Sequence, residues 1–118
     1  MDEKKFRKLV GEAIDSLPKE FAEKLNNVSI VVEDAPSFQL LKELKIPPWS
    51  LLFGLYQGVP QTKRGNYIGV LPDKITIFKN PIEQVSQTEE EIIEKIRSTV
   101  IHEVGHHFGL SEEDLRKD

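Results

Sequence analysis

Hydrophobic side chains recur at helical spacing in the first part of the chain. From residue 6 onward they lie three or four positions apart, the spacing of one helix face: Phe6, Leu9, Val10, Ala13, Ile14 and Leu17. The pattern predicts helical structure across residues 3–25. Pro18 interrupts it, and we expect Pro18 to be the first residue of a second short helix, PKEFAEKL. The pair Asn26-Asn27 ends that helix.

The middle of the chain has the alternation that is typical of strands. The segment VSIVVEDAP, residues 28–36, puts Val28, Ile30 and Val32 on one face. LLFGLYQG, residues 51–58, has strand-forming residues, and its glycines favour a bent or edge strand. KITIFKN, residues 74–80, predicts a further strand that ends at Asn80-Pro81. Residues 37–50 are ambiguous, with a helical turn or two before Pro47-Pro48, and QTKRGNY, residues 61–67, indicates a turn.

A long helix is predicted after residue 88, and both of its ends are marked. Thr88 and Glu91 form a T-x-x-E capping box, in which each side chain can bond the other residue's backbone N–H. Gly109 supplies the stop, since glycine tolerates the left-handed conformation that ends many helices. Between them runs an apolar stripe for packing on a sheet: Ile92, Ile96, Val100, Val104 and Phe108, with Ile93 and Ile101 beside it.

Composition narrows the classes of function. With 118 residues we expect a single domain, residues 1–118. The chain has no cysteine, so a metal would need His, Asp or Glu ligands. The net charge of −4 gives no general reason to bind nucleic acid. No apolar run approaches the roughly 20 residues that span a bilayer, and the charged start is not a signal peptide, so we expect no membrane association and a cytoplasmic location.

All three histidines lie within the motif HEVGHH of the predicted helix. His102 and His106 are four residues apart, so they project within roughly 40° of each other and can hold one zinc ion. Glu103 lies on the flank of this surface, where it can reach a water on the metal without being a ligand. This is the H-E-x-x-H arrangement, in which the glutamate takes the proton of that water.

A catalytic zinc site needs a third protein ligand beside the two histidines. Glu112 follows His102 by ten residues, the spacing of the third ligand in longer H-E-x-x-H motifs, and Gly109 lets the chain turn back. Glu113 and Asp114 are the alternatives. The same acids could instead be an ordinary helix start with Ser111 as its N-cap, and one glutamate could serve both purposes.

His107 is the odd histidine, because it points roughly 100° away from His106. We expect it to have a structural role and not to share the metal.

The chain resembles the minimal zincin-like metallopeptidases of bacteria, whose motif is H-E-x-x-H-x-x-G-x-x-D. Three further segments resemble the family in the same order: SLPKEFAEKLNNVSIVVEDAP, LLFGLYQGVPQTKR and GVLPDKITIFKNPI. The resemblance implies an α+β fold, a minimal zincin core with a small mixed sheet packed against the motif-bearing helix. It implies His102, His106 and Glu112 as metal ligands and Glu103 as the catalytic residue. The family has aspartate where Glu112 stands, and glutamate is one methylene longer.

The expected function is that of a zinc metallopeptidase that hydrolyses peptide bonds through a zinc-activated water, with Glu103 as general base. Its partners would be peptide or protein substrates, and we expect a monomer. A strand before the motif helix, KITIFKN, is the expected edge for an extended peptide. Two alternatives stand: a non-peptidase zinc hydrolase, such as a nuclease or amidase, and a metal-binding protein or interaction module without turnover. So small a protease could require an activating partner protein or a narrow substrate.

Overall fold

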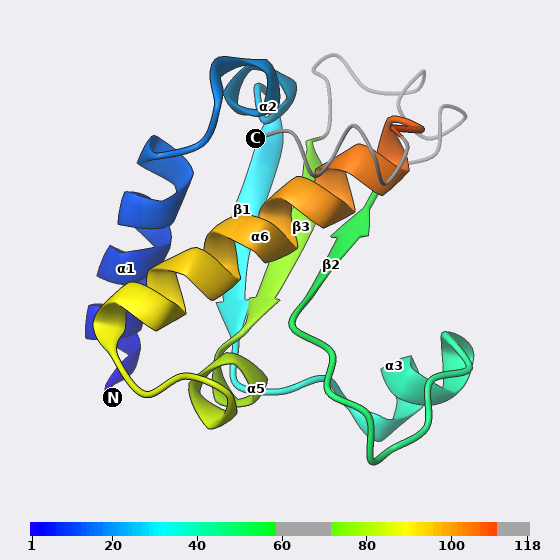
Figure 1. Ribbon diagram of the computed structural model, residues 1–118. Helices are drawn as coiled ribbons and strands as arrows, with labels where there is room; N and C mark the ends of the chain where they lie inside the picture. Colours follow the sequence, from blue (N-terminus) through cyan, green and yellow to red (C-terminus); the bar gives the residue numbers. More distant parts are fainter. Residues whose placement is uncertain (59–71, 111–118) are drawn as a thin grey trace.

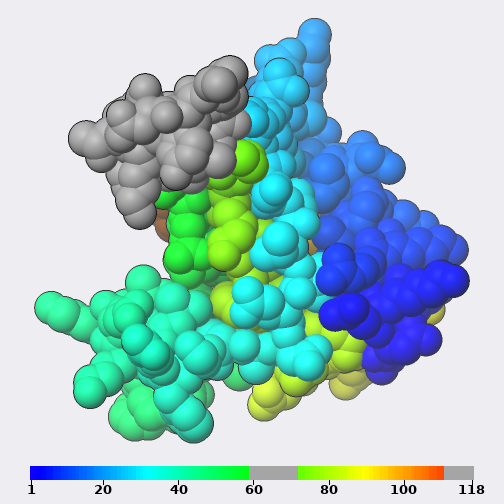
Figure 2. Space-filling model, turned by 180° about the vertical axis from the view of Figure 1, so that it is seen from behind, coloured from blue at the N-terminus to red at the C-terminus, as the bar shows by residue number. Residues whose placement is uncertain are grey.

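The computed structural model describes residues 1–58 and 72–110, and within them a sheet is covered by helices on one face (Figure 1). The predicted turn at residues 61–67 lies outside the described residues. The elements in chain order are α1 (Glu3–Asp15), α2 (Lys19–Lys24), β1 (Val28–Glu33), α3 (Phe38–Glu43), β2 (Gly54–Gln57), β3 (Asp73–Phe78), α5 (Lys79–Gln84) and α6 (Glu89–His107). Figure 1 shows α6 crossing the sheet with α1 beside it. Seen from behind, no described helix lies in front of the strands (Figure 2). The arrangement is α+β, as the sequence predicts.

The described strands form one mixed sheet in the order β1-β3-β2. The central strand β3 runs parallel to β1, with Ile75 beside Ile30, and antiparallel to β2, with Ile75 opposite Tyr56. The expectation that KITIFKN offers a sheet edge is therefore wrong, because this strand has a partner on each side. Its residues Ile75–Phe78 are all buried, which is typical of an interior strand. The segment 51–58 does supply an edge strand, β2, as predicted.

The core lies between the sheet and the helices α1 and α6. The predicted face of α1 is confirmed, since Phe6, Leu9, Val10 and Ala13 are buried. On α6 the stripe is buried from Ile92 to Val104. The spacing predicts that Phe108 continues this stripe, but the residue is 47% exposed because it lies beyond the last packed turn. The same helix therefore supplies core residues and, on its flank, the motif.

The ends of α6 are those that the sequence predicts. The side chain of Thr88 accepts a hydrogen bond from the Glu91 N–H, and the Glu91 carboxylate accepts one from the Thr88 N–H, so the capping box is complete. Gly109 has a φ of 76°, in the left-handed region. A capping box and a left-handed glycine fix the helix length, and with it the position of the motif near its carboxyl end.

Two assignments differ from those expected, at the end of β3 and at the start of α2. The strand over 74–80 ends at Phe78, and Asn80-Pro81 falls in the first turn of α5, which the sequence did not predict. Proline fits there because backbone N–H groups of a first helical turn have no partner within the helix. The ambiguous segment 37–50 contains α3, capped by the Ser37 side chain. Pro18 is the N-cap of α2 and not its first residue, so the helix begins one residue later than expected, at Lys19.

In the part of the chain that the structure describes, no helix is long and apolar enough to cross a membrane.

Candidate metal centre

His102 and His106 lie on neighbouring turns of α6, near its carboxyl end. Their ring centroids are 6.1 Å apart, with the ring planes at 76° to each other. His102 is partly buried and His106 is exposed. The helix therefore brings together the two imidazoles that the H-E-x-x-H spacing predicts, without help from any other element.

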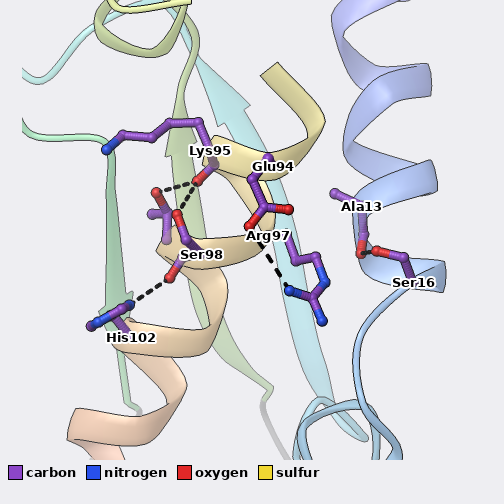
Figure 3. A network of polar contacts seen from close by, with 8 residues as sticks. Ala13, Ser16, Glu94, Lys95, Arg97, Ser98 and His102 are labelled. Carbon is purple, nitrogen blue, oxygen red and sulfur yellow. Dashed lines mark hydrogen bonds and ion pairs between the residues drawn. The ribbon is translucent and has the colours of Figure 1, made fainter. Parts of the chain in front are cut away.

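The His102 ring is oriented by its own helix. Its Nδ1 lies 2.9 Å from the carbonyl oxygen of Ser98, one turn earlier, as Figure 3 shows. A carbonyl can only accept a hydrogen bond, so this contact assigns the proton to Nδ1. The lone pair of the neutral ring is then on Nε2. An imidazole that donates through one nitrogen and presents the other is the usual form of a metal-binding histidine.

Glu103 is tied to the edge strand of the sheet. Its Oε1 accepts a hydrogen bond of 2.9 Å from the backbone N–H of Tyr56 in β2. The N–H of Phe78 bonds the carbonyl of Phe53, and bonded and non-bonded pairs alternate along antiparallel strands. Tyr56 therefore falls in a non-bonded pair with Ile75, and its N–H points away from β3. The carboxylate meets the sheet at its outer edge, beside the two histidines.

Gly54 allows α6 to approach β2 closely enough for this bond. A Cβ atom at Gly54 would lie 2.7 Å from Cγ2 of Thr99 on α6 and 3.0 Å from the carbonyl oxygen of Thr76 on β3. Real Cβ atoms are not found at the shorter distance, so a larger residue would push the helix and the strand apart. The sequence indicated a bend or an edge at this glycine; the structure adds a close approach between two backbones.

His107 takes part in a cluster of its own. Its ring stacks on Tyr56, with centroids 4.0 Å apart and an interplanar angle of 22°. The Tyr56 hydroxyl donates a 2.6 Å hydrogen bond to Oδ2 of Asp73, and Nε2 of His107 lies 3.9 Å from the same oxygen. The cluster joins the end of α6 to β2 and β3. The sequence did not predict Tyr56 or Asp73 as neighbours of the motif, because their meeting depends on the strand pairing.

The predicted third ligand is not among the residues that the structure describes. Glu112 is outside the described residues, as are the alternatives Glu113 and Asp114. Within residues 1–58 and 72–110, no three His, Cys, Asp or Glu side chains converge as a metal site would require. Two histidines one turn apart, with His102 oriented through Nδ1, fit the nitrogen part of a zinc site. The role of Glu112 stays a prediction.

A cavity opens beside His102 and Glu103 on the side toward the start of α6. Its volume is about 270 Å³. One wall is the chain that enters β2, residues 51–54, and the other is α6, with Lys95, Ser98 and Thr99. The cavity shares two residues with the motif, so a molecule held at His102 and Glu103 would extend into it.

The family is decided by comparison with family models. The model of the zincin-like metallopeptidases matches residues 25–118. This chain belongs to the zincin-like metallopeptidase family. The match covers β1, β2, β3 and the motif helix, and it confirms the resemblance to the zincin-like metallopeptidases as a family.

One solved structure has a similar fold. It is that of a conserved hypothetical protein from Thermus thermophilus, with 19% identity and a TM-score of 0.56 over 99% of this chain and 100% of that one. At this identity the similarity concerns the fold alone. Among curated proteins no match to the chain is found.

Proposed function

We propose that this zincin-like protein is a zinc-dependent peptidase that hydrolyses peptide bonds, with Glu103 as the general base. His102 and His106 would hold the metal, with Glu112 as the third ligand. The observation that supports this proposal most is the hydrogen bond between Glu103 and the Tyr56 N–H. This bond holds the carboxylate beside the two histidines, but on the flank of the helix and not on the face that carries the histidines. A base that is not a metal ligand is expected to have this position.

Zinc, when bound, supplies a Lewis acid that polarises a carbonyl group and makes a water more acidic. The residues of the chain provide the rest of the chemistry. The Ser98 carbonyl keeps the proton of His102 on Nδ1, and so directs its Nε2 lone pair outward. The Tyr56 N–H holds one oxygen of Glu103 at 2.9 Å, which limits the rotation of the carboxylate.

Glu103 would act twice in one cycle. As a carboxylate it takes a proton from the attacking water, and as a carboxylic acid it gives that proton to the nitrogen of the leaving amine. The hydrogen bond from the Tyr56 N–H occupies one oxygen of the carboxylate and leaves the second oxygen for the proton. The cycle therefore ends with Glu103 in its starting form.

The outer edge of β2 is the place where an extended peptide would lie. This edge is next to the motif, whereas β3 is enclosed by its two neighbours. A peptide that lies along this edge would pass the Glu103 carboxylate, which already accepts the outward N–H of Tyr56, so its pairing would use other backbone groups of β2. Peptides or proteins are thus the proposed substrates. We further propose a monomer in the cytoplasm, with an activating partner protein or a narrow substrate to compensate for the small core.

The test is incubation of zinc-loaded protein with a diverse peptide library, followed by mass spectrometry of the products. The proposal expects cleavage that disappears in Glu103→Gln. Retention of zinc with no cleavage of any peptide would favour a metal-binding protein without turnover. Hydrolysis of another bond type, with peptides untouched, would favour a nuclease or amidase.

A further inference from the structure

The cavity beside the motif has the position of a substrate subsite. It is lined by His102 and Glu103 at one end and by Lys95, two turns earlier on α6, at the other. A peptide with its cleaved bond at Glu103 would place a neighbouring side chain in this cavity of about 270 Å³. This step rests on the proposed function, because it takes Glu103 as the reacting centre.

The walls of the cavity between these ends are mostly apolar. Leu51, Leu52 and Phe53 form the side toward β2. On α6 the hydroxyl groups of Ser98 and Thr99 both donate to the Lys95 carbonyl, at 3.1 and 2.7 Å. Hydroxyl groups that donate to their own helix have no proton left to donate to a ligand and offer it only acceptor lone pairs. The middle of the cavity therefore suits methylene groups.

Lys95 places a positive charge at the far end. Its ammonium nitrogen lies 4.1 Å from the centroid of the Phe53 ring, a cation–π contact that holds the side chain against the wall. Figure 3 shows the Lys95 side chain reaching from α6 toward the chain that leads into β2. The residue is only partly exposed. Its charge is thus directed along the cavity wall and is partly shielded from bulk water.

The acids nearest to Lys95 on its own helix are engaged with other groups. Glu91 accepts hydrogen bonds from the N–H groups of Gln87 and Thr88, and Glu94 lies 4.0 Å from Arg97. In residues 1–58 and 72–110, no carboxylate lies within 4.0 Å of the Lys95 ammonium group. Glu103 is eight residues further along the helix, roughly 12 Å away at 1.5 Å per residue. An acidic group bound at Lys95 would therefore not approach the base.

We propose that this cavity is a specificity subsite for an acidic side chain, glutamate in the first place, next to the cleaved bond. The methylene groups of the side chain would lie on the leucines and Phe53, and its carboxylate would pair with Lys95. Glutamate fits better than aspartate because the charge lies at the end of an apolar passage. Lys95 is thus a specificity residue that does not touch the reacting atoms.

The test measures binding separately from cleavage. Zinc-loaded protein is titrated with blocked, otherwise neutral hexapeptides that carry Glu, Gln or Leu at one position, moved along the peptide. Backbone amide signals of Gly54, Ser98 and Thr99 report on the cavity by nuclear magnetic resonance. At one position the Glu peptide should bind about three- to tenfold more tightly than the Gln peptide, the range for one partly shielded charge pair.

Variants of Lys95 identify the group responsible. Lys95→Gln should abolish the preference, Lys95→Glu should reverse it toward a Lys peptide, and Lys95→Arg should retain it. Lys74→Gln is the matched control, because Lys74 is an exposed lysine of β3 that does not line the cavity. Equal binding of Glu and Gln peptides, tighter binding of Leu, absence of binding, or a preference that persists in Lys95→Gln would overturn the assignment.

Cleavage assays with the same peptides separate this proposal from the proposed function. A Glu preference that depends on Lys95, without hydrolysis of any peptide, would support the subsite and contradict the peptidase. Hydrolysis without a Glu preference would support the peptidase and contradict the subsite.

Discussion

The carboxylate of Glu103 on α6 is held by the backbone N–H of Tyr56 on β2, at 2.9 Å. The two residues are 47 positions apart in the chain, so only the packed fold brings them together. Because the donor is a backbone group, a substitution of Tyr56 removes it directly only if the new residue is proline, which has no backbone N–H. The bond thus links the position of the proposed base to the separation between the helix and the edge strand.

Replacing Glu103 by glutamine separates metal binding from chemistry. The amide oxygen can still accept the Tyr56 N–H, so the geometry should be kept, and zinc should bind as in the wild type. Hydrolysis of a peptide found to be a substrate should be lost, since an amide cannot take the proton of water. Zinc content and initial rates are measured together. Glu94→Gln, an exposed position of the same helix, is the control, and a wild-type rate in Glu103→Gln would exclude Glu103 as the base.

Alanine variants of the three histidines should differ clearly in their zinc content. Chelator-stripped, zinc-reloaded protein should hold about one equivalent of zinc, as a single three-ligand site would. His102→Ala and His106→Ala should lose it. His107→Ala should keep it, because the His107 ring stacks on Tyr56 and is oriented away from the ligand pair. Elemental analysis gives the result, and full zinc content in His102→Ala would contradict the site.

A side chain larger than hydrogen at Gly54 should create a steric clash between β2 and α6. Gly54→Ala puts a methyl group 2.7 Å from Cγ2 of Thr99, and should cost about 1–3 kcal/mol in the free energy of unfolding. Hydrolysis should fall with it, since Tyr56 and Glu103 are moved apart. Urea denaturation measures the first effect. Thr99→Ser removes the clashing methyl group but keeps the hydroxyl, so the double variant should recover part of the loss.

The control for this substitution is the same change on open surface. Gly11 of α1 has no atom within 4 Å of the position of an added Cβ. Gly11→Ala should therefore stabilise the protein, by roughly 0.5–1 kcal/mol from the helix preference of alanine. Equal effects at Gly11 and Gly54 would show that contact with Thr99 is not the cause.

Variants of the acidic residues after Gly109 test which of them is the third metal ligand. Glu112→Ala should weaken zinc binding by more than the roughly 10- to 100-fold typical of residues that only support a ligand. Glu113→Ala and Asp114→Ala should leave the affinity unchanged, and Glu112→Asp should largely preserve it. Competition with a zinc chelator gives the affinities. If a neighbour of Glu112 has the large effect instead, the ligand is misassigned; if none has, the stretch is only a helix start.

The sequence predicts α6 well because its signals are local. Thr88 and Glu91 cap it, and Gly109 adopts the left-handed conformation expected of a stop. The positions of His102 and His106 then follow from helix geometry. Phe108 shows the limit of periodicity, since a pattern of spacing does not reveal where the packed partner of a helix ends.

Pairing between distant segments could not be predicted in this way. KITIFKN has the pattern of a strand, but its central place depends on partners at 28–33 and 54–57. The same pairing brings Tyr56 to Asp73 and to Glu103. The sequence indicates that Gly54 has a special role, but whether a glycine marks a bend or a close contact depends on the residues that face it in the fold. The proposed ligand pair is thus evident in the sequence, and the support for the base is not.

This difference has a consequence for how the centre assembles. His102 and His106 are brought together by one turn of helix, so even a partly folded chain with α6 formed presents both rings. The restraint on Glu103 appears only when the sheet has formed and docked, because contacts of high sequence separation come with the tertiary fold. If the chain binds zinc as proposed, the histidine pair would therefore not depend on the bond between Tyr56 and Glu103. A partly folded chain would then have these two proposed ligands in place while its proposed base is still unrestrained.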